Sequence, residues 1–456
     1  MGVLSANLAS SEIPRLRRVL SLGDLILYGI VAVTPSAPVT VFGLASVRAR
    51  GHTVDTILFA MVAMALTAIS YGRMASIYPA AGSAYTYVGR GLNPHLGFVA
   101  GWAMLLDYIL NPLFCVVYCS LLALRLLPHL PYVVISACFA LGMTYLNLRG
   151  IRATARTNQV LMAVMGILLL AFIALAIRYL LSSQGWGGLF STIPFYDPRE
   201  FDFRSVLHAT SFAALTYIGF DAVTTLAEDV HNPKRNVLLA IVIVVLFTGF
   251  FGGALTYLAQ RVWPDFRTFP DVATAFMDAT RRVGGAALFE ALVVLVAIAD
   301  FGAGMAMQVG SARLLFGMGR DNVLPKRLFA YLDPRSNTPT FNILLIGALS
   351  FAGSLGKRYD LIAELLNFGA FLGFMGVNAA VIRQFYFLPQ TGRTRNFFLD
   401  LVVPSLAFVI CLIIWLGLGN LAKIVGGAWF AAGLSYLAIR TRGFRLAPLM
   451  IDFRES

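Results

Sequence analysis

The stretch Phe212-Ala-Ala-Leu-Thr-Tyr-Ile-Gly-Phe-Asp-Ala-Val-Thr-Thr-Leu-Ala-Glu228 combines an apolar background with residues that a lipid-facing helix avoids. It carries Gly219, the aromatic residues Tyr217 and Phe220, and the carboxylate of Asp221. A charged aspartate at the centre of a bilayer costs about 3 kcal/mol on insertion scales. We therefore expect this stretch to lie inside a helix bundle or beside water, with its backbone opened at Gly219.

A second stretch, Tyr28-Gly-Ile-Val-Ala-Val-Thr-Pro-Ser-Ala-Pro38, places two prolines in the first apolar span. Proline removes a backbone donor and clashes with the preceding turn, so the span should kink or unwind near Pro35. Two interrupted membrane helices, each opening one half of a chain, indicate the binding site of a transporter. The alternative is that Pro35 and Pro38 only kink a packed helix.

The composition indicates an all-α membrane protein. Of its 456 residues, 59% are hydrophobic and 12% are charged, whereas soluble proteins have about 25% charged residues. The apolar residues come in runs of about 20, long enough to cross a lipid bilayer. The net charge of +13 fits cytoplasmic loops and does not indicate nucleic acid binding, because the charges lie between the apolar runs. The four cysteines fall in apolar runs, so we expect free thiols, with no metal site and no cofactor.

The apolar runs predict twelve membrane-spanning helices in one polytopic domain. An even number places both termini on the same side of the membrane. Lysine and arginine are more numerous in the tails and in the even-numbered connections than in the alternate ones, which favours cytoplasmic termini. The predicted spans are Leu20–Val47, Val54–Tyr78, Pro94–Leu124, Pro131–Leu148, Thr157–Leu181, Ser205–Val230, Val237–Arg261, Gly284–Met318, Pro339–Leu355, Leu361–Phe385, Leu399–Leu418 and Leu421–Arg440.

The spacing of the spans suggests an internal organisation. Residues 1–19 form an N-terminal tail, and 20–385 form a core of ten helices. Its halves, about 20–181 and 205–385, each open with a broken span, which suggests an inverted repeat. Residues 399–440 add two helices, and 441–456 form a C-terminal tail.

Four parts of the chain resemble the amino acid–polyamine–organocation (APC) transporters. They are Ala81–Tyr87, Asn93–Tyr108, Tyr217–Ala222, and Ser311-x-Arg313 together with Gly319-Arg-Asp-Asn-Val-Leu-Pro325. The resemblance runs in order along nearly the whole chain. It implies a fold of two inverted five-helix repeats plus two peripheral helices.

Within these transporters, the chain is most similar to the bacterial putrescine importers. The similarity lies in Ser70-Tyr-Gly72, Leu106-Asp-Tyr108, Gly219-Phe-Asp-Ala-Val-Thr-Thr-Leu226 and Met318-Gly-Arg-Asp-Asn322. It implies a multi-pass transporter of the bacterial inner membrane that binds an amine or amino acid. The chain also departs from this pattern: those importers have an aspartate where this chain has Thr40. It also has no lysine between Thr157 and Leu181, where some relatives use one in place of sodium.

The candidate binding residues lie at the two predicted breaks and on the third span. Unwound backbone exposes N–H and C=O groups that attract a carboxylate or a cation. Asp107 lies about 20 Å along its helix from Pro94, near the middle of the membrane, and Tyr108 can face a cationic group. Structural roles for both are the alternative. The predicted substrate-binding residues are Val33, Thr34, Pro35, Ser36, Ala37, Asp107, Tyr108, Phe212, Leu215, Tyr217, Ile218, Gly219 and Phe220.

Three carboxylates are candidates for coupling transport to an ion. Asp221 and Glu228 are seven residues apart, so they share a face of a continuous helix, and Asp300 lies in the middle of the eighth span. Carboxylates inside a membrane mark proton or ion pathways. The coupling ion is therefore H⁺ or Na⁺, and an obligate exchanger is a further alternative. For Glu228, a solvated helix end or a salt bridge with Lys234 or Arg235 is the competing interpretation.

Other classes of function fit the sequence less well. No GxxxxGK[ST] motif is present, which disfavours direct use of ATP. The five histidines are scattered and form no HExxH motif, so a membrane enzyme is disfavoured. A channel is disfavoured by the two broken helices and by the lack of a repeated filter segment. The leading interpretation is a secondary active importer, and the sequence does not indicate its oligomeric state.

Overall fold

The computed structural model describes residues 20–78, 83–149, 155–320, 324–333, 338–388 and 395–446. In these ranges the secondary structure is helical, apart from an isolated parallel bridge between Leu20 and Val230. The expected all-α class is therefore confirmed. The predicted tails, 1–19 and most of 441–456, lie outside the described residues.

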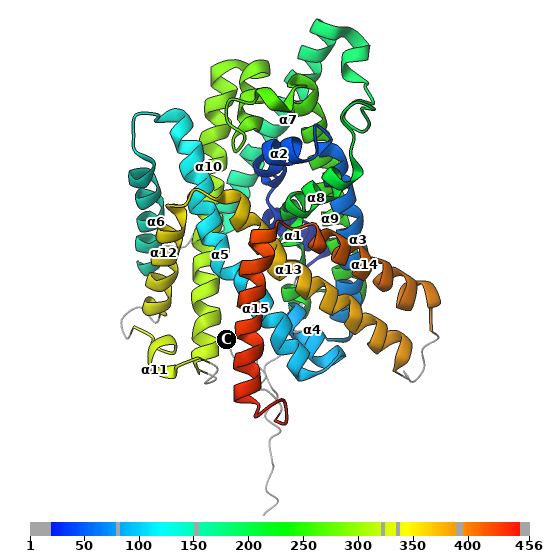
Figure 1. Ribbon diagram of the computed structural model, residues 1–456, viewed down its shortest axis with the longest axis vertical. Coiled ribbons are helices and arrows are strands. Elements are labelled where there is room, and N and C mark those ends of the chain that lie inside the picture. Colours follow the sequence, from blue (N-terminus) through cyan, green and yellow to red (C-terminus); the bar gives the residue numbers. More distant parts are fainter. Residues whose placement is uncertain are drawn as a thin grey trace, which may run out of the picture.

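Seven helices make up the first part of the chain (Figure 1). They are α1 (Leu22–Val33), α2 (Ala37–Arg48), α3 (Thr53–Ile77), α4 (Ser83–Gly91), α5 (Pro94–Leu126), α6 (Tyr132–Leu148) and α7 (Ala155–Leu189). Short-range chemistry sets where they begin. Ser21 and Asp24 form a capping box at α1, in which the Ser21 N–H donates to Asp24 Oδ2 over 2.8 Å. Asn93 Oδ1 accepts the Leu96 N–H over 2.8 Å at the start of α5.

In its described residues, the second part contains eight α-helices and five short 3₁₀ or π segments. They are α8 (Phe203–Ala213), η1 (Ala214–Tyr217), η2 (Phe220–Asp229), α9 (Pro233–Val262), η3 (Phe266–Thr268), α10 (Ala275–Arg320), α11 (Lys326–Phe329), α12 (Thr340–Ser354), α13 (Tyr359–Val381), η4 (Ile382–Phe387), η5 (Phe398–Val402), α14 (Val403–Leu416) and α15 (Asn420–Arg440).

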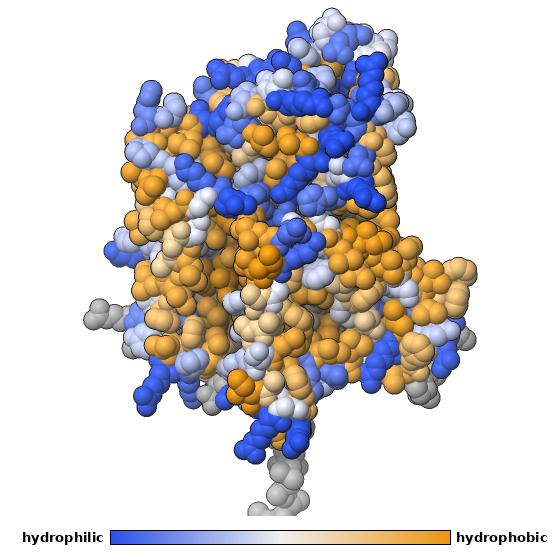
Figure 2. Space-filling view, in the orientation of Figure 1, coloured by the Kyte–Doolittle hydropathy of each residue, from blue (hydrophilic) through white to orange (hydrophobic). Residues whose placement is uncertain are grey.

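The helices are long and apolar enough for a multi-pass membrane protein. Within the described residues, nine helices have the length and hydropathy of a span, and α1 with α2 forms one further bent pair. Two helices in predicted spans, α6 and α12, are shorter than the others. Figure 2 shows hydrophobic side chains over a broad belt of the molecule, with hydrophilic ones concentrated towards both ends of its long axis.

The helices pack around α5, which contacts α4, α6, α10, α12, α13 and α15. Helices α6 and α12 pack together on one side of the molecule, and α14 lies on the opposite side in Figure 1. The broken segments α1, α2, η1 and η2 pack with α3 and α9. This arrangement places the two predicted breaks and the acidic residues of α5 and α10 inside the bundle.

Glycines with positive φ mark two interruptions of regular helix. Helix α10 runs from Ala275 to Arg320 but is kinked at Gly285, whose φ of 68° is non-helical, so a straight helix begins next to Gly284, the predicted start of the eighth span. In the predicted sixth span, α8 ends at Ala213 and the chain continues as the 3₁₀ segments η1 and η2, on either side of Gly219. Glycine adopts the positive φ at both positions without strain.

Candidate functional site

The first span is broken where the prolines predict it. Helix α1 ends at Val33, α2 begins at Ala37, and the two helices are bent by 45°. Between them, Thr34 has φ 59° and ψ 121°, a conformation that is strained for a β-branched residue. Its N–H closes α1 by donating to Ile30 O over 3.1 Å, and its hydroxyl donates to Val33 O over 2.6 Å.

The sixth span is broken at Gly219, as the sequence predicts. After the 3₁₀ turn η1, Ile218 (φ −57°, ψ 130°) and Gly219 (φ 103°, ψ −10°) have the angles of a type II turn. This turn needs positive φ at its second central residue, which glycine adopts without strain. The chain then resumes as η2 in a new direction.

The two breaks are in contact. A Cβ atom on Gly219 would lie 2.7 Å from the carbonyl oxygen of Ala32, in the last turn of α1. Further along, the His231 N–H donates to Leu20 O over 3.0 Å. The broken spans therefore lie against each other, and the missing side chain of Gly219 permits their close approach.

The predicted binding residues at the breaks fall into two groups. Thr34, Pro35, Ala37, Ile218 and Gly219 are partly exposed at the junction. The others are buried: Val33, Ser36, Phe212, Leu215, Tyr217 and Phe220.

Two of the buried residues differ in whether their polar atoms have partners. The Tyr217 hydroxyl donates to Ile57 O over 2.8 Å, which fixes it to α3. Ser36 Oγ is fully buried and has no hydrogen-bond partner among the described residues. The serine hydroxyl is therefore available to a ligand, whereas the tyrosine hydroxyl is used by the fold.

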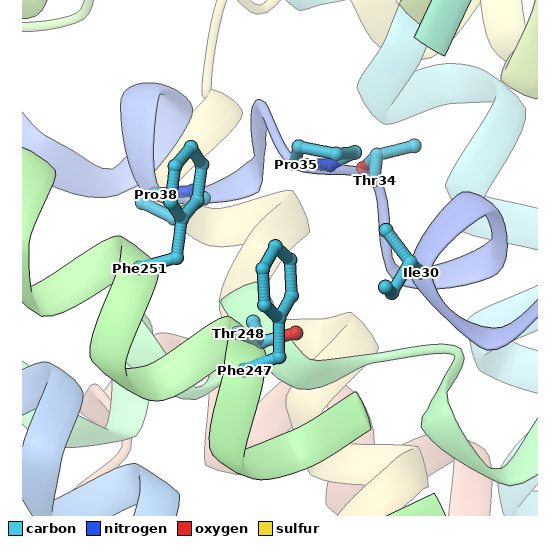
Figure 3. A pocket seen from close by; sticks show the side chains of 7 residues that line it. All are labelled: Ile30, Thr34, Pro35, Pro38, Phe247, Thr248 and Phe251. Atoms are coloured by element: carbon cyan, nitrogen blue, oxygen red, sulfur yellow. The ribbon is translucent and has the colours of Figure 1, made fainter. Parts of the chain in front are cut away.

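A shallow hollow lies beside the first break (Figure 3). Its lining comes from both sides of the break and from α9, and is almost entirely apolar: Ile30, Thr34, Pro35, Pro38, Phe247, Thr248 and Phe251. None of the predicted residues of the second break lines it. The hollow is therefore bounded by the first break and α9, and the second break does not contribute to its lining.

Asp107 and Asp221 form the first acidic region. Asp107 on α5 is 6% exposed, and its Oδ1 has no partner among the described residues. Asp221 follows the second break, and its Oδ2 accepts the Ser83 hydroxyl over 3.0 Å. The two carboxylates are close enough to interact electrostatically. Asp221 also interacts with Tyr108, so this region combines two acids with an aromatic residue on adjacent elements.

Asp300 belongs to a different region of the bundle. It is 8% exposed, and its Oδ2 lacks a partner in the described part of the chain. Cys119 Sγ donates to Ala297 O over 3.4 Å, and a Cβ on Gly304 would lie 2.9 Å from Cys115 Cβ. Asp300 therefore faces the part of α5 about ten residues beyond Asp107, which is roughly 15 Å along the helix.

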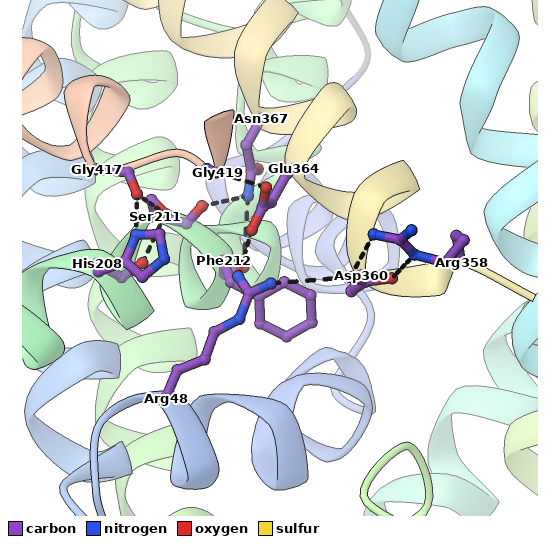
Figure 4. Close-up of polar contacts among 10 residues, drawn as sticks. All are labelled: Arg48, His208, Ser211, Phe212, Arg358, Asp360, Glu364, Asn367, Gly417 and Gly419. Carbon is purple, nitrogen blue, oxygen red and sulfur yellow. Dashed lines mark hydrogen bonds and ion pairs between the residues drawn. The ribbon is translucent and has the colours of Figure 1, made fainter. Parts of the chain in front are cut away.

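The ends of four elements meet in a polar cluster that the sequence analysis did not predict (Figure 4). Arg48, at the end of α2, forms an ion pair with Glu364 of α13, and its Nη2 lies 4.0 Å from Asp360 Oδ2. Its guanidinium carbon lies 5.3 Å above the centroid of the Phe212 ring. Phe212, predicted to bind substrate at the break, thus lies under this ion pair. A hydrogen bond to Asp360 raises the pKa of Arg358, which borders the cluster.

One feature of the sequence indicates this cluster. Glu364 falls inside the predicted span Leu361–Phe385, and a carboxylate inside a span needs a partner. The partner, Arg48, is 316 residues away in the chain, so periodicity and spacing could not identify it.

A second ion pair lies on the other side of the breaks from this cluster. Arg73, near the end of α3, pairs with Asp400 of η5, and both side chains are buried. The Arg73 guanidinium carbon also lies 4.3 Å from the centroid of the Phe385 ring.

Glu228 is the remaining candidate for coupling. Its backbone lies in η2, and its side chain is outside the described part of the structure.

Comparison with known proteins identifies the family. The profile of the amino acid permease family matches residues 38–434. The chain is 31% identical over 433 residues to the low-affinity putrescine importer PlaP of Escherichia coli (strain K12), covering 94% of this chain and 95% of that protein. It is 27% identical over 457 residues to the branched-chain amino acid permease BcaP of Bacillus subtilis (strain 168), covering 93% of each.

A third relative shows how varied the substrates of similar proteins are. The methylthioribose transporter of Bacillus subtilis (strain 168) is 27% identical over 447 residues, covering 93% of this chain and 94% of that protein. The resemblance found in the sequence motifs is thus confirmed over almost the full length. The chain belongs to the amino acid permease family of APC transporters, and is a multi-pass membrane transporter rather than an enzyme.

Proposed function

We propose that the protein is a secondary active transporter that imports an amino acid or a polyamine such as putrescine by alternating access. Contact between the two broken spans, near the buried carboxylate of Asp107 and the part-buried carboxylate of Asp221, supports this proposal, since transporter sites form where discontinuous helices meet. The relative PlaP is named a putrescine importer, and the relative BcaP is named a branched-chain amino acid permease. Both substrate classes carry an ammonium group.

The proposal includes an architecture and an orientation. The ten-helix core 20–385 consists of two inverted repeats, about 20–181 and 205–385, and helices within 399–440 are peripheral. Counting α6 and α12 as spans gives twelve helices. We place both tails, 1–19 and 441–456, in the cytoplasm of a bacterial cell, so that Arg48 lies at the outer side and Arg73 at the inner side.

Asp107 and Asp300 take separate roles in this proposal, and Asp221 is a candidate for both substrate binding and coupling. Asp107 and Asp221 receive the substrate ammonium, with Tyr108 beside them. The two nitrogens of putrescine are separated by five bonds, about 6 Å at bond lengths near 1.5 Å. Asp300 faces α5 at a point roughly 15 Å along the helix from Asp107, so we expect a diamine bound at Asp107 not to reach it. Its second ammonium meets carbonyl groups or aromatic rings, and Asp300 remains available for coupling.

Proton coupling is the form that we propose first. A carboxylate that binds a proton from outside and releases it inside links transport to the proton gradient, and Asp221, Asp300 and Glu228 are the candidates. Sodium coupling is the alternative, because carboxylate and carbonyl oxygens suit a hard cation. Exchange of one substrate for another is the third form.

An amino acid is the competing substrate class, favoured by the unpartnered hydroxyl of Ser36 and the opened backbone around it. Peptide N–H groups and a hydroxyl at a helix break bind a carboxylate, which a diamine lacks. The Thr40 position, where putrescine importers are expected to have aspartate, also fits a substrate with one ammonium.

Uptake by proteoliposomes tests the proposed function. Radiolabelled putrescine and a panel of amino acids are offered to the purified protein, with a pH jump or a sodium jump across otherwise identical vesicles. We expect saturable accumulation of one class, driven by the pH jump. Absence of uptake for putrescine and for every amino acid would refute the substrate proposal. Accumulation driven by sodium alone would show that sodium, and not the proton, is the coupling ion.

A further inference from the structure

The outer polar cluster has the components of a site for an organic cation. Glu364 and Asp360 supply two carboxylates, and the Phe212 ring supplies a cation–π surface. Arg48 occupies this site with its guanidinium, and Figure 4 shows it reaching from α2 towards the groups of the other elements. The Glu364 side chain is 4% exposed, while that of Asp360 is 27% exposed, so one carboxylate faces inwards and the other faces the surface.

The site is held in place without Arg48. Glu364 Oε2 accepts the Gly419 N–H over 3.0 Å, and Asn367 Nδ2 donates to Ser211 O over 2.7 Å, beside Phe212. The Phe212 ring also makes an edge contact with Tyr359, with centroids 6.1 Å apart. These contacts connect α8, α13 and the segment before α15. Arg48 is the residue that α2 contributes to the cluster, so release of its guanidinium leaves the carboxylates and the ring joined by these contacts.

Two buried polar atoms at the site point to a further ligand. The Tyr359 hydroxyl and Asn367 Oδ1 have no hydrogen-bond partner among the described residues. Both residues are more than nine-tenths buried, and Tyr359 interacts electrostatically with both Arg48 and Asp360. Buried polar groups normally have a partner. An ammonium carries three donors, and the unpartnered oxygens can accept hydrogen bonds that a fixed guanidinium leaves unmade.

We propose that this cluster is an outer docking site for an alkylammonium group, and that Arg48 is its displaceable internal occupant. The inference rests on the proposed function in one respect, namely that the substrate carries an ammonium group. An ammonium that binds Glu364, Asp360 and the Phe212 face competes with Arg48. Its binding favours the state in which the Arg48 guanidinium is released from the carboxylates, because a ligand shifts an equilibrium only through different affinities for the two states.

Removing the competing cation tests the proposal. Binding of putrescine is measured on purified protein in nanodiscs, in an Asp107→Asn background that weakens the inner site. Adding Arg48→Gln is expected to lower the apparent Kd for putrescine tenfold or more. Arg50→Gln is the matched control, because it removes an exposed arginine two residues away and should leave the Kd unchanged. Butane-1,4-diol, which has the same chain without charges, should not bind.

A further substitution locates the site. Adding Glu364→Gln to the Arg48→Gln protein should abolish the gain in affinity. If Arg48→Gln elutes as misfolded protein on size exclusion, Arg48→Lys replaces it and should give a smaller gain, because lysine lacks the bidentate geometry of arginine. An unchanged Kd in the folded Arg48 variant, or an equal gain in Arg50→Gln, overturns the proposal.

The outcome is separable from that of the proposed function. Wild-type protein that binds ammonium at the outer site but transports no amine or amino acid would refute the transport proposal alone. Protein that transports putrescine and shows no effect of Arg48→Gln on binding would refute the docking site alone.

Discussion

The two broken spans reach the same kind of backbone interruption by different chemistry. In the sixth span a glycine takes the positive φ of the turn, whereas in the first span Thr34 takes positive φ between helices that two prolines interrupt. The second break also has its own carboxylate, Asp221, while the first offers hydroxyl groups. One break is therefore relaxed and charged, and the other is strained and neutral, which suggests different tasks for two segments that touch.

The largest effect is expected at the relaxed break. Gly219→Ala places a Cβ 2.7 Å from Ala32 O at a φ of 103°. Positive φ costs an alanine about 1–2 kcal/mol, and overpacking costs about 1–3 kcal/mol. We therefore expect the free energy of unfolding to fall by about 3 kcal/mol and transport to be lost. Thermal unfolding in detergent and uptake measure both. Gly427→Ala is the control, since a Cβ there meets nothing within 4 Å; equal stability of the two variants would contradict the close contact of the breaks.

The next largest effect is expected when the carboxylate charge at the second break is removed. Asp221→Asn keeps an oxygen for the Ser83 hydroxyl but loses the charge. We expect gradient-driven accumulation to fall about tenfold or more, equivalent to about 1.4 kcal/mol, while exchange of substrate across the membrane changes less. Exchange does not require the empty carrier to reorient. Asp265→Asn, on an exposed connection, is the control. Wild-type accumulation with an unchanged response to pH and sodium would exclude Asp221 from coupling.

Local sequence patterns were sufficient to predict both breaks and the membrane class. Proline at 35 and glycine at 219 act on their own backbone, and apolar runs determine spans without tertiary information. The positive φ of Thr34 was not predictable, because the contacts of α1 and α2 impose it on a residue that disfavours it.

The arrangement of the acidic residues depends on tertiary packing. Asp107 was a candidate for binding substrate, and Asp221 and Asp300 were candidates for coupling. The register of α5 against α10 places the Asp300 region beside Cys115 and Cys119, about two to three helical turns beyond Asp107, which the sequence does not encode in any short pattern. The pairing of Arg48 with Glu364 was missed for the same reason, since it joins residues 316 positions apart.

A smaller effect is expected from the hydroxyl of the first break. Ser36→Ala removes an oxygen that is buried without a partner among the described residues, so stability should change by less than about 1 kcal/mol. If Ser36 binds substrate, affinity should fall about fivefold, the effect of one neutral hydrogen bond of about 1 kcal/mol. Equilibrium binding and thermal unfolding separate the two. Ser350→Ala, another buried serine without a partner in the described structure, should affect neither; unchanged affinity in Ser36→Ala would remove it from the site.

The smallest effect concerns the strain of the first break. Thr34→Gly relieves a conformation that costs a side-chain-bearing residue about 1–3 kcal/mol. It also loses the bond from Thr34 Oγ1 to Val33 O, and glycine adds about 0.5–1 kcal/mol of unfolded-state entropy. These contributions nearly cancel, so we expect Thr34→Gly to raise the free energy of unfolding by at most about 1 kcal/mol. Thr34→Val keeps the β-branch and the strain without the hydroxyl, so its stability should fall below the wild type. A Thr34→Gly protein less stable than Thr34→Val would show that the threonine is not strained, and the two breaks would then differ in charge alone.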